Sequence, residues 1–309
     1  MDKNKFYTKK INIILLAVIC CILWGSAYPA IKIGYSLFNI SSADAGSKLV
    51  FAGYRFALAG ILVLVFQIIR KEKVLDFTKH DYISISILGL IQTTMQYIFF
   101  YIGLTYTTGV RGSIINGTGT FFSILLAHFL YKNDRLNLNK IIGCSVGFAG
   151  VIIVSINGSS SLNGSFSFMG EGFIMIAALC FAVGAVYSKK ITQNKNASTI
   201  TGLQLLIGGV VLTVLGFVMG GRLKNFTAVS SLLLLYMALL SSVAFTLWTQ
   251  LLKFNKVGDI SIFNFLVPVF GTLLSAVFLG ENIFNIKILI SLALVCIGIY
   301  AVNKEHKLQ

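Results

Sequence analysis

The chain has 309 residues, of which 56% are hydrophobic and only 11% are charged, and its net charge is +15. A soluble domain carries about 25% charged residues, so this chain has too little charge to cover a water-facing surface. Together with a mean hydropathy of +0.86, the composition predicts a multi-pass membrane protein whose surroundings are a lipid bilayer.

Apolar runs close to the length of a bilayer-spanning helix, roughly 20 residues, follow one another along the chain. We predict ten spans, joined by loops that are too short to hold a soluble domain. The predicted spans cover residues 11–34, 49–69, 82–104, 110–131, 139–156, 171–188, 199–220, 230–252, 259–279 and 286–302.

Lysine and arginine residues are unevenly divided between the two ends of these spans. With the amino terminus inside, eighteen of the 25 lie in inner segments, six lie at outer ends and Arg55 lies within a span. Positive residues favour the cytoplasmic side of a membrane. We therefore predict a plasma-membrane protein with both termini in the cytoplasm. No nucleic-acid partner is expected, because the positive residues are spread over several loops on the predicted cytoplasmic side and do not form one patch.

Two stretches of the chain repeat one plan, in which a polar break separates two apolar runs. They cover residues 111–156 and 258–303, and at a constant offset of 147 residues Asp134 falls on Glu281 and Lys140 on Lys287. The identities are sparse, so the repeat is recognised mainly from hydropathy. The pattern predicts an all-α membrane protein with ten transmembrane helices in two five-helix repeats, over residues 11–156 and 171–303. Because five is odd, the second repeat must be inverted, which is typical of transporters.

The first and ninth spans contain the only two prolines of the chain, Pro29 and Pro268. Proline removes a backbone hydrogen bond and kinks a helix, so we predict that Trp24 to Pro29 interrupts the first span. Broken apolar segments point toward a transport pathway, and both prolines are candidate hinges. Trp24 and Tyr28, four residues apart, share one face at the break, either as plain aromatic packing or as part of that pathway.

Arg55 is the one charge well inside a span. Its side chain either snorkels outward or pairs with a neighbour, or it attracts a carboxylate of the substrate. No aspartate or glutamate lies near the middle of any span. A buried carboxylate is the usual ion relay of a pump and the natural counter-charge for a cation. Its absence weighs against cation efflux and leaves proton coupling without an obvious carrier.

Uncharged polar side chains gather at mid-depth, most clearly in the third span. Helical spacing places Gln92 and Gln96 on one face, with Thr93 and Tyr97 beside them. A polar stripe that faced lipid would be costly, so it faces protein or a cavity. It serves either for hydrogen bonds between helices or as the wall of a cavity for a polar, zwitterionic or neutral metabolite. Similar residues in other spans are Asn116, Thr120, Ser241, Ser242, Thr246, Trp248 and Asn264.

Three glycines in the fifth span, Gly143, Gly147 and Gly150, form a ridge of small residues. Small residues let the backbones of neighbouring helices approach closely. We interpret this ridge as structural and expect another helix to pack on it.

Several segments resemble the drug/metabolite transporter superfamily, EamA family. They are LWGSAYPAIK in span one, RFALAG in span two, GLTYTTG after span three, GFAGVIIV in span five and FLVPVFGTLLSAVFLGE in span nine. The resemblance covers essentially the whole chain as two EamA-type repeats. It implies export or exchange of small metabolites such as amino acids through a central cavity. One departure is Phe121, which stands where many members carry a second proline equivalent to Pro268, so the halves are expected to bend unequally.

We therefore predict a transporter that exports or exchanges a small polar metabolite, an amino acid or a related compound, by alternating access. The alternatives are efflux of drug-like or cationic compounds, or a membrane scaffold without transport. No enzyme activity, metal or cofactor is expected, because HExxH, GxSxG and buried aspartate pairs are absent. Its partner is a small-molecule substrate, and the protein is a monomer or homodimer. The predicted substrate-binding residues are Trp24, Tyr28, Gln92, Gln96, Tyr97, Asn116, Thr120, Ser241, Trp248 and Asn264.

Overall fold

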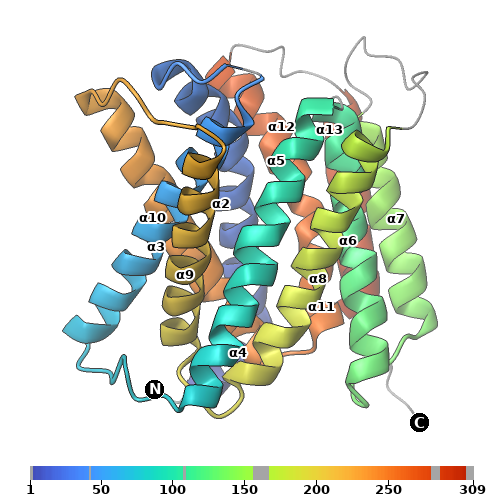
Figure 1. Ribbon diagram of the computed structural model, residues 1–309. Coiled ribbons are helices and arrows are strands. Elements are labelled where there is room, and N and C mark those ends of the chain that lie inside the picture. The colour runs from blue at the N-terminus through green and yellow to red at the C-terminus, as the bar shows by residue number, and fades with distance from the viewer. Residues whose placement is uncertain (1–2, 42, 107–108, 156–166, 280–285, 304–309) are drawn as a thin grey trace.

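In a computed structural model of the protein, the helices lie side by side in one bundle (Figure 1). The structure describes residues 3–41, 43–106, 109–155, 167–279 and 286–303, and these residues form no strand. The predicted polar break around Glu281 lies outside them. The elements are α1 (Lys3–Thr8), α2 (Lys10–Leu37), α3 (Ala45–Ile69), α4 (Lys79–Gly89), η1 (Leu90–Met95), α5 (Gln96–Tyr106), α6 (Gly109–Leu130), α7 (Leu138–Ser155), η2 (Phe168–Gly172), α8 (Phe173–Thr192), α9 (Ala197–Val218), α10 (Ala228–Phe254), α11 (Val257–Ser261), η3 (Ile262–Phe265), α12 (Leu266–Leu279) and α13 (Ile286–Asn303).

The helices have the length and composition of membrane-crossing segments. Large apolar side chains such as Val65, Phe66 and Val214 are exposed on the outside of the bundle, which suits contact with lipid rather than water. The chain is therefore a multi-pass membrane protein. Six described stretches are long and apolar enough to cross a bilayer, namely Lys10–Leu37, Ala45–Ile69, Lys79–Leu104, Phe168–Thr192, Ala197–Val218 and Ala228–Phe254, and four shorter ones are Ile115–Leu130, Leu138–Ile153, Val257–Gly271 and Ala293–Asn303.

The first and last described segments lie at the same end of the bundle. The Asn255 side chain, just after α10, donates a hydrogen bond to the backbone oxygen of Tyr7 in α1 at 3.0 Å. The Asn303 side chain, at the end of α13, donates to the backbone oxygen of Asp259 in α11 at 3.4 Å. These contacts bring α1, α10, α11 and α13 together at that end.

Helices α3 and α9 pack backbone to backbone. Glycines recur every seven residues on both helices, so each set lies along one face. A Cβ atom added at Gly53 would lie 2.2 Å from the Thr213 hydroxyl oxygen, and one at Gly209 would lie 2.3 Å from the Ala57 nitrogen. The glycine faces are Gly46, Gly53 and Gly60 on α3, and Gly202, Gly209 and Gly216 on α9. Both helices therefore need glycine there.

The predicted glycine ridge of the fifth span is confirmed at Gly143. A Cβ atom at this position of α7 would lie 2.6 Å from the backbone oxygen of Gly298 in α13. At Gly147 such an atom would lie 2.5 Å from the ring of Phe265, and the Gly147 backbone also borders α13, since a Cβ atom at Gly298 would lie 2.9 Å from the Gly147 nitrogen. The ridge thus packs against α13 at both glycines and also against an aromatic side chain at Gly147.

The two prolines affect their helices differently. Helix α2 continues through Pro29 from Lys10 to Leu37, so the prediction that Trp24 to Pro29 interrupts the first span is wrong. A proline in a long helix removes one hydrogen bond, which neighbouring packing can compensate. The ninth span is divided into α11, the 3₁₀ turn η3 and α12, and Pro268 lies in the first turn of α12, where its missing N–H is tolerated.

Three charged side chains form a buried group that we call the ionic cluster: Asp134, Lys140 and Asp259. The Lys140 ammonium binds the Asp134 carboxylate and lies 3.6 Å from the Asp259 carboxylate. Asp134 also accepts a hydrogen bond from the backbone nitrogen of Gly258 at 3.0 Å. The cluster therefore joins the α6–α7 connection to the start of α11, two segments from opposite halves of the sequence.

Candidate functional site

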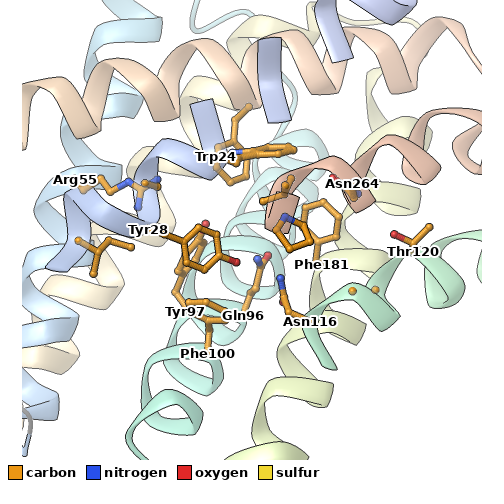
Figure 2. A pocket seen from close by; sticks show the side chains of 17 residues that line it. Trp24, Tyr28, Arg55, Gln96, Tyr97, Phe100, Asn116, Thr120, Phe181 and Asn264 are labelled. Carbon is orange, nitrogen blue, oxygen red and sulfur yellow. The ribbon is translucent and has the colours of Figure 1, made fainter. Parts of the chain in front are cut away.

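A cavity of about 120 Å³ lies within the bundle, and both halves of the chain contribute to its wall. Figure 2 shows Gln96 and Asn116 directed from α5 and α6 toward the space beside Trp24 and Phe181. The lining residues are Trp24, Ala27, Tyr28, Ile31, Arg55, Gln96, Tyr97, Phe100, Asn116, Gly117, Gly119, Thr120, Phe181, Phe245, Asn264, Val267 and Pro268. The lining contains no aspartate or glutamate within the described part of the chain.

Aromatic rings form one side of the cavity around Trp24. Its ring meets the rings of Phe181, Phe245 and Trp248 in edge-on contacts, with centroids 6.2, 5.5 and 5.0 Å away. Edge-to-face packing of this kind fixes ring orientation. Trp248 is 2% exposed and supports Trp24 from behind without lining the cavity. The aromatic side is therefore a rigid, apolar surface.

A π-helical turn lies among the polar residues of the third span. Residues Leu90–Met95 form η1, whose hydrogen bonds span five residues instead of four. Gln92 packs against α8, where a Cβ atom at Gly184 would lie 2.7 Å from the Gln92 Cβ atom. Gln96 lines the cavity. Four residues make about one turn in either type of helix, so the shared face of the two glutamines stays a prediction, and of the two only Gln96 lines the cavity.

The other polar residues of this segment hold helices together. The Thr93 hydroxyl donates to the side-chain oxygen of Gln204 in α9 at 2.8 Å, and the Thr94 hydroxyl donates to the backbone oxygen of Gly208 at 3.1 Å. Tyr97 lines the cavity and packs on Phe56 of α3, with centroids 4.4 Å apart. Some members of the polar stripe therefore form hydrogen bonds between helices, and others line the cavity.

Arg55 is buried at the cavity wall with 2% of its surface exposed. Its Nε donates a hydrogen bond to the Ser241 hydroxyl at 2.7 Å, and its guanidinium carbon lies 4.9 Å from the centre of the Phe56 ring. The Ser241 hydroxyl in turn donates to the backbone oxygen of Met237 at 2.8 Å. Arg55 therefore does not snorkel to the outer surface, and Ser241 orients it.

Three buried polar atoms of the lining residues have no hydrogen-bond partner among the described residues. They are the side-chain oxygen of Gln96, the side-chain nitrogen of Asn264 and the indole nitrogen of Trp24. A buried polar atom without a partner costs about 1–3 kcal/mol, so each favours a hydrogen-bonding ligand. Asn264 lies in η3, the 3₁₀ turn that divides the ninth span. The broken ninth span thus brings polar groups to the cavity.

Seven of the ten predicted binding residues line the cavity, and three do not. Gln92 lies at a helix interface, Ser241 lies behind Arg55 and Trp248 lies behind Trp24. The predicted hinge Pro268 is at the wall and Pro29 is not. Prediction from polarity missed three apolar aromatic residues, which carry no polar signal. The seven are Trp24, Tyr28, Gln96, Tyr97, Asn116, Thr120 and Asn264, and the missed three are Phe100, Phe181 and Phe245.

The chain matches the model of the EamA-like transporter family twice, over residues 11–156 and 168–304. The uncharacterized transporter YvbV of Bacillus subtilis is 26% identical over 96% of this chain and 92% of its own length. The uncharacterized inner membrane transporter YedA of Escherichia coli is 25% identical over 90% of this chain and 89% of its own. A protein of known crystal structure has a similar fold, with a TM-score of 0.77 over 96% of this chain and 97% of its own at 17% identity.

Proposed function

This chain belongs to the EamA-like transporter family, and from this membership we propose that it carries a small polar metabolite, an amino acid or a related compound, across the cell membrane. The observation that carries the proposal is the cavity, where uncharged polar groups, aromatic rings and one charged side chain, Arg55, meet from both halves of the chain. A mostly apolar wall with a few placed polar groups and a single charge suits a small polar ligand.

The proposed architecture is ten transmembrane helices in two inverted repeats. Three observations support it: the family model matches each half once, six long and four shorter apolar helices are present among the described residues, and the first and last described helices lie at one end of the bundle. Transporters built from inverted repeats bind their substrate near the membrane midplane between the halves.

The proposed mechanism is alternating access around this fixed site. A substrate can shift the balance between two conformations only by binding one more tightly than the other. The ionic cluster and the broken ninth span supply contacts between the halves that can differ between conformations. We propose exchange or uniport, because no carboxylate of the described residues lines the cavity to carry a proton. The same feature disfavours efflux of cations, which would lack a counter-charge.

The proposed orientation predicts opposite accessibility of two exposed loops. Asn194, between α8 and α9, belongs to the lysine-rich end, whereas Lys224, between α9 and α10, belongs to the other end. A cysteine at position 224 is expected to react with a membrane-impermeant maleimide in intact cells, and a cysteine at position 194 only after permeabilisation. Labelling of both positions from the same side would show that α9 does not cross the membrane and would refute the proposed ten-span topology.

Substitution of Gln96 by leucine tests the proposed function. The change removes an acceptor from the cavity wall, so we expect substrate binding and the transport rate at low concentration to fall about tenfold. The measurement is counterflow of radiolabelled L-amino acids in proteoliposomes. Gln92→Leu is the matched control one turn away, outside the cavity, and is expected to retain transport. Equal transport by wild type and both folded variants would show that the cavity is not the substrate site.

A further inference from the structure

Arg55 places a permanent positive charge at the cavity wall, where the described residues supply no carboxylate. We propose, on the basis of the proposed function, that the substrate is a zwitterion of the α-amino acid type whose carboxylate binds Arg55. The cavity would then bind one chemical class of ligand, and Arg55 would be a substrate-binding residue.

The first argument is charge. A guanidinium stays protonated in proteins, and Arg55 is 2% exposed. Among the described residues its partners are neutral, the Ser241 hydroxyl at 2.7 Å and the Phe56 ring at 4.9 Å. A buried charge without an opposite charge is costly, and a charged hydrogen-bonding partner offsets that cost. A ligand carboxylate in the cavity would supply this partner.

The second argument is orientation. The guanidinium has five N–H donors in a rigid plane, and Ser241 takes the one on Nε. Tyr101 also interacts with the group, while the Phe56 ring lies against its face. The guanidinium is therefore held in place before a ligand arrives, and donors remain for a carboxylate. Preorganisation of this kind lowers the entropy lost on binding.

The third argument is what lies opposite the positive charge. The side-chain oxygen of Gln96 accepts no hydrogen bond from the described residues, and an ammonium group is a donor that fits it. The rings of Trp24 and Phe100 also line the cavity, and aromatic rings attract cations. A ligand with two negative charges would need a second cation, and among the described residues no lysine or other arginine lines the cavity. A ligand with one carboxylate for Arg55 and one ammonium group for the Gln96 oxygen therefore fits the cavity wall.

The fourth argument is size. The cavity of about 120 Å³ has room for about four water molecules at roughly 30 Å³ each. That is the size of a small amino acid and is too small for a nucleotide or a sugar conjugate.

The test compares ligands that differ only in the carboxylate. The purified full-length protein is heated in detergent with L-alanine, L-serine or L-threonine, or with the carboxamide of each. A ligand that binds the folded state raises the melting temperature by an amount that grows with the logarithm of its concentration relative to its dissociation constant. We expect at least one free amino acid to stabilise wild type, and its amide to need at least tenfold higher concentration for the same shift.

Two variants attribute this difference to Arg55. Arg55→Gln is expected to remove the preference for the free acid. Arg55→Lys keeps the positive charge but lacks the planar set of five donors, and it is expected to retain part of the preference. The melting temperature without ligand shows whether each variant folds. If Arg55→Gln does not fold, Ser241→Ala takes its place and is expected to weaken binding of the acid but not of the amide.

The outcomes separate this proposal from the proposed function. Equal stabilisation by acid and amide, lost in Gln96→Leu, would overturn the role of Arg55 and leave the cavity as the substrate site. An unchanged preference for the acid in a folded Arg55→Gln protein would also overturn it. If no compound of either set stabilises wild type, the zwitterion proposal is wrong, and the counterflow assay then decides the proposed function separately.

Discussion

Replacing Gly209 with alanine is expected to lower the free energy of unfolding by about 3 kcal/mol, the upper part of the usual range for overpacking. The added Cβ atom would lie 2.3 Å from the backbone nitrogen of Ala57 and 2.8 Å from the carbonyl carbon of Phe56. Backbone atoms cannot rotate away as a side chain can, so α3 and α9 must separate along their length. The measurement is thermal unfolding of the purified protein in detergent.

Gly117→Ala is the matched control for this prediction. Gly117 also lies inside a helix, but a Cβ atom there would meet only the Phe148 ring and Val151 at 3.5 Å or more, an ordinary contact. Since alanine favours helix formation over glycine by about 1 kcal/mol, this variant is expected to be as stable as wild type. Equal melting temperatures for the two variants would mean that α3 and α9 are not in backbone contact.

A second glycine on the facing helix makes the test more specific. Gly53→Ala would place its Cβ atom 2.6 Å from the backbone nitrogen of Thr213 and so force the same separation of α3 from α9. Once the helices have moved apart for one methyl group, the other costs less. The double variant is therefore expected to lose less stability than the sum of the two single variants, as coupled neighbours do.

The glycine faces show which part of the packing could be predicted. The ridge at Gly143 was recognised from its short spacing within one helix. The spacing of seven residues on α3 and α9 is also visible in the sequence. Which helix each glycine face contacts is a long-range property of the fold, and the pattern within one helix does not reveal it.

The candidate site is predictable in part from the sequence. Depth and spacing identify seven of the residues that line the cavity, whereas Gln92 packs on α8 instead. Helical periodicity indicates which residues share a face, but not which neighbouring helix or cavity each of them meets. Arg55 was recognised as unusual, yet its partner Ser241 lies 186 residues away, beyond the reach of local reasoning.

Replacing Lys140 with methionine is expected to destabilise the protein by about 3 kcal/mol, because loss of one partner from a buried ion pair leaves an uncompensated charge. The Asp134 side chain is 2% exposed and the Asp259 side chain 31%, so two neighbouring carboxylates would lose their shared cation. Lys189 also interacts electrostatically with both, which places the expected loss at the lower end of the range. Thermal or denaturant unfolding of the purified protein measures it.

Asp134→Asn provides the comparison that identifies the cause. Lys140 would keep the Asp259 carboxylate at 3.6 Å, and an asparagine oxygen can still accept from the Gly258 nitrogen, so the expected loss is only about 1 kcal/mol. Adding Asp134→Asn to Lys140→Met removes one of the two stranded carboxylates and should recover part of the lost stability. If the double variant is less stable than Lys140→Met alone, repulsion between Asp134 and Asp259 is not the reason for the loss.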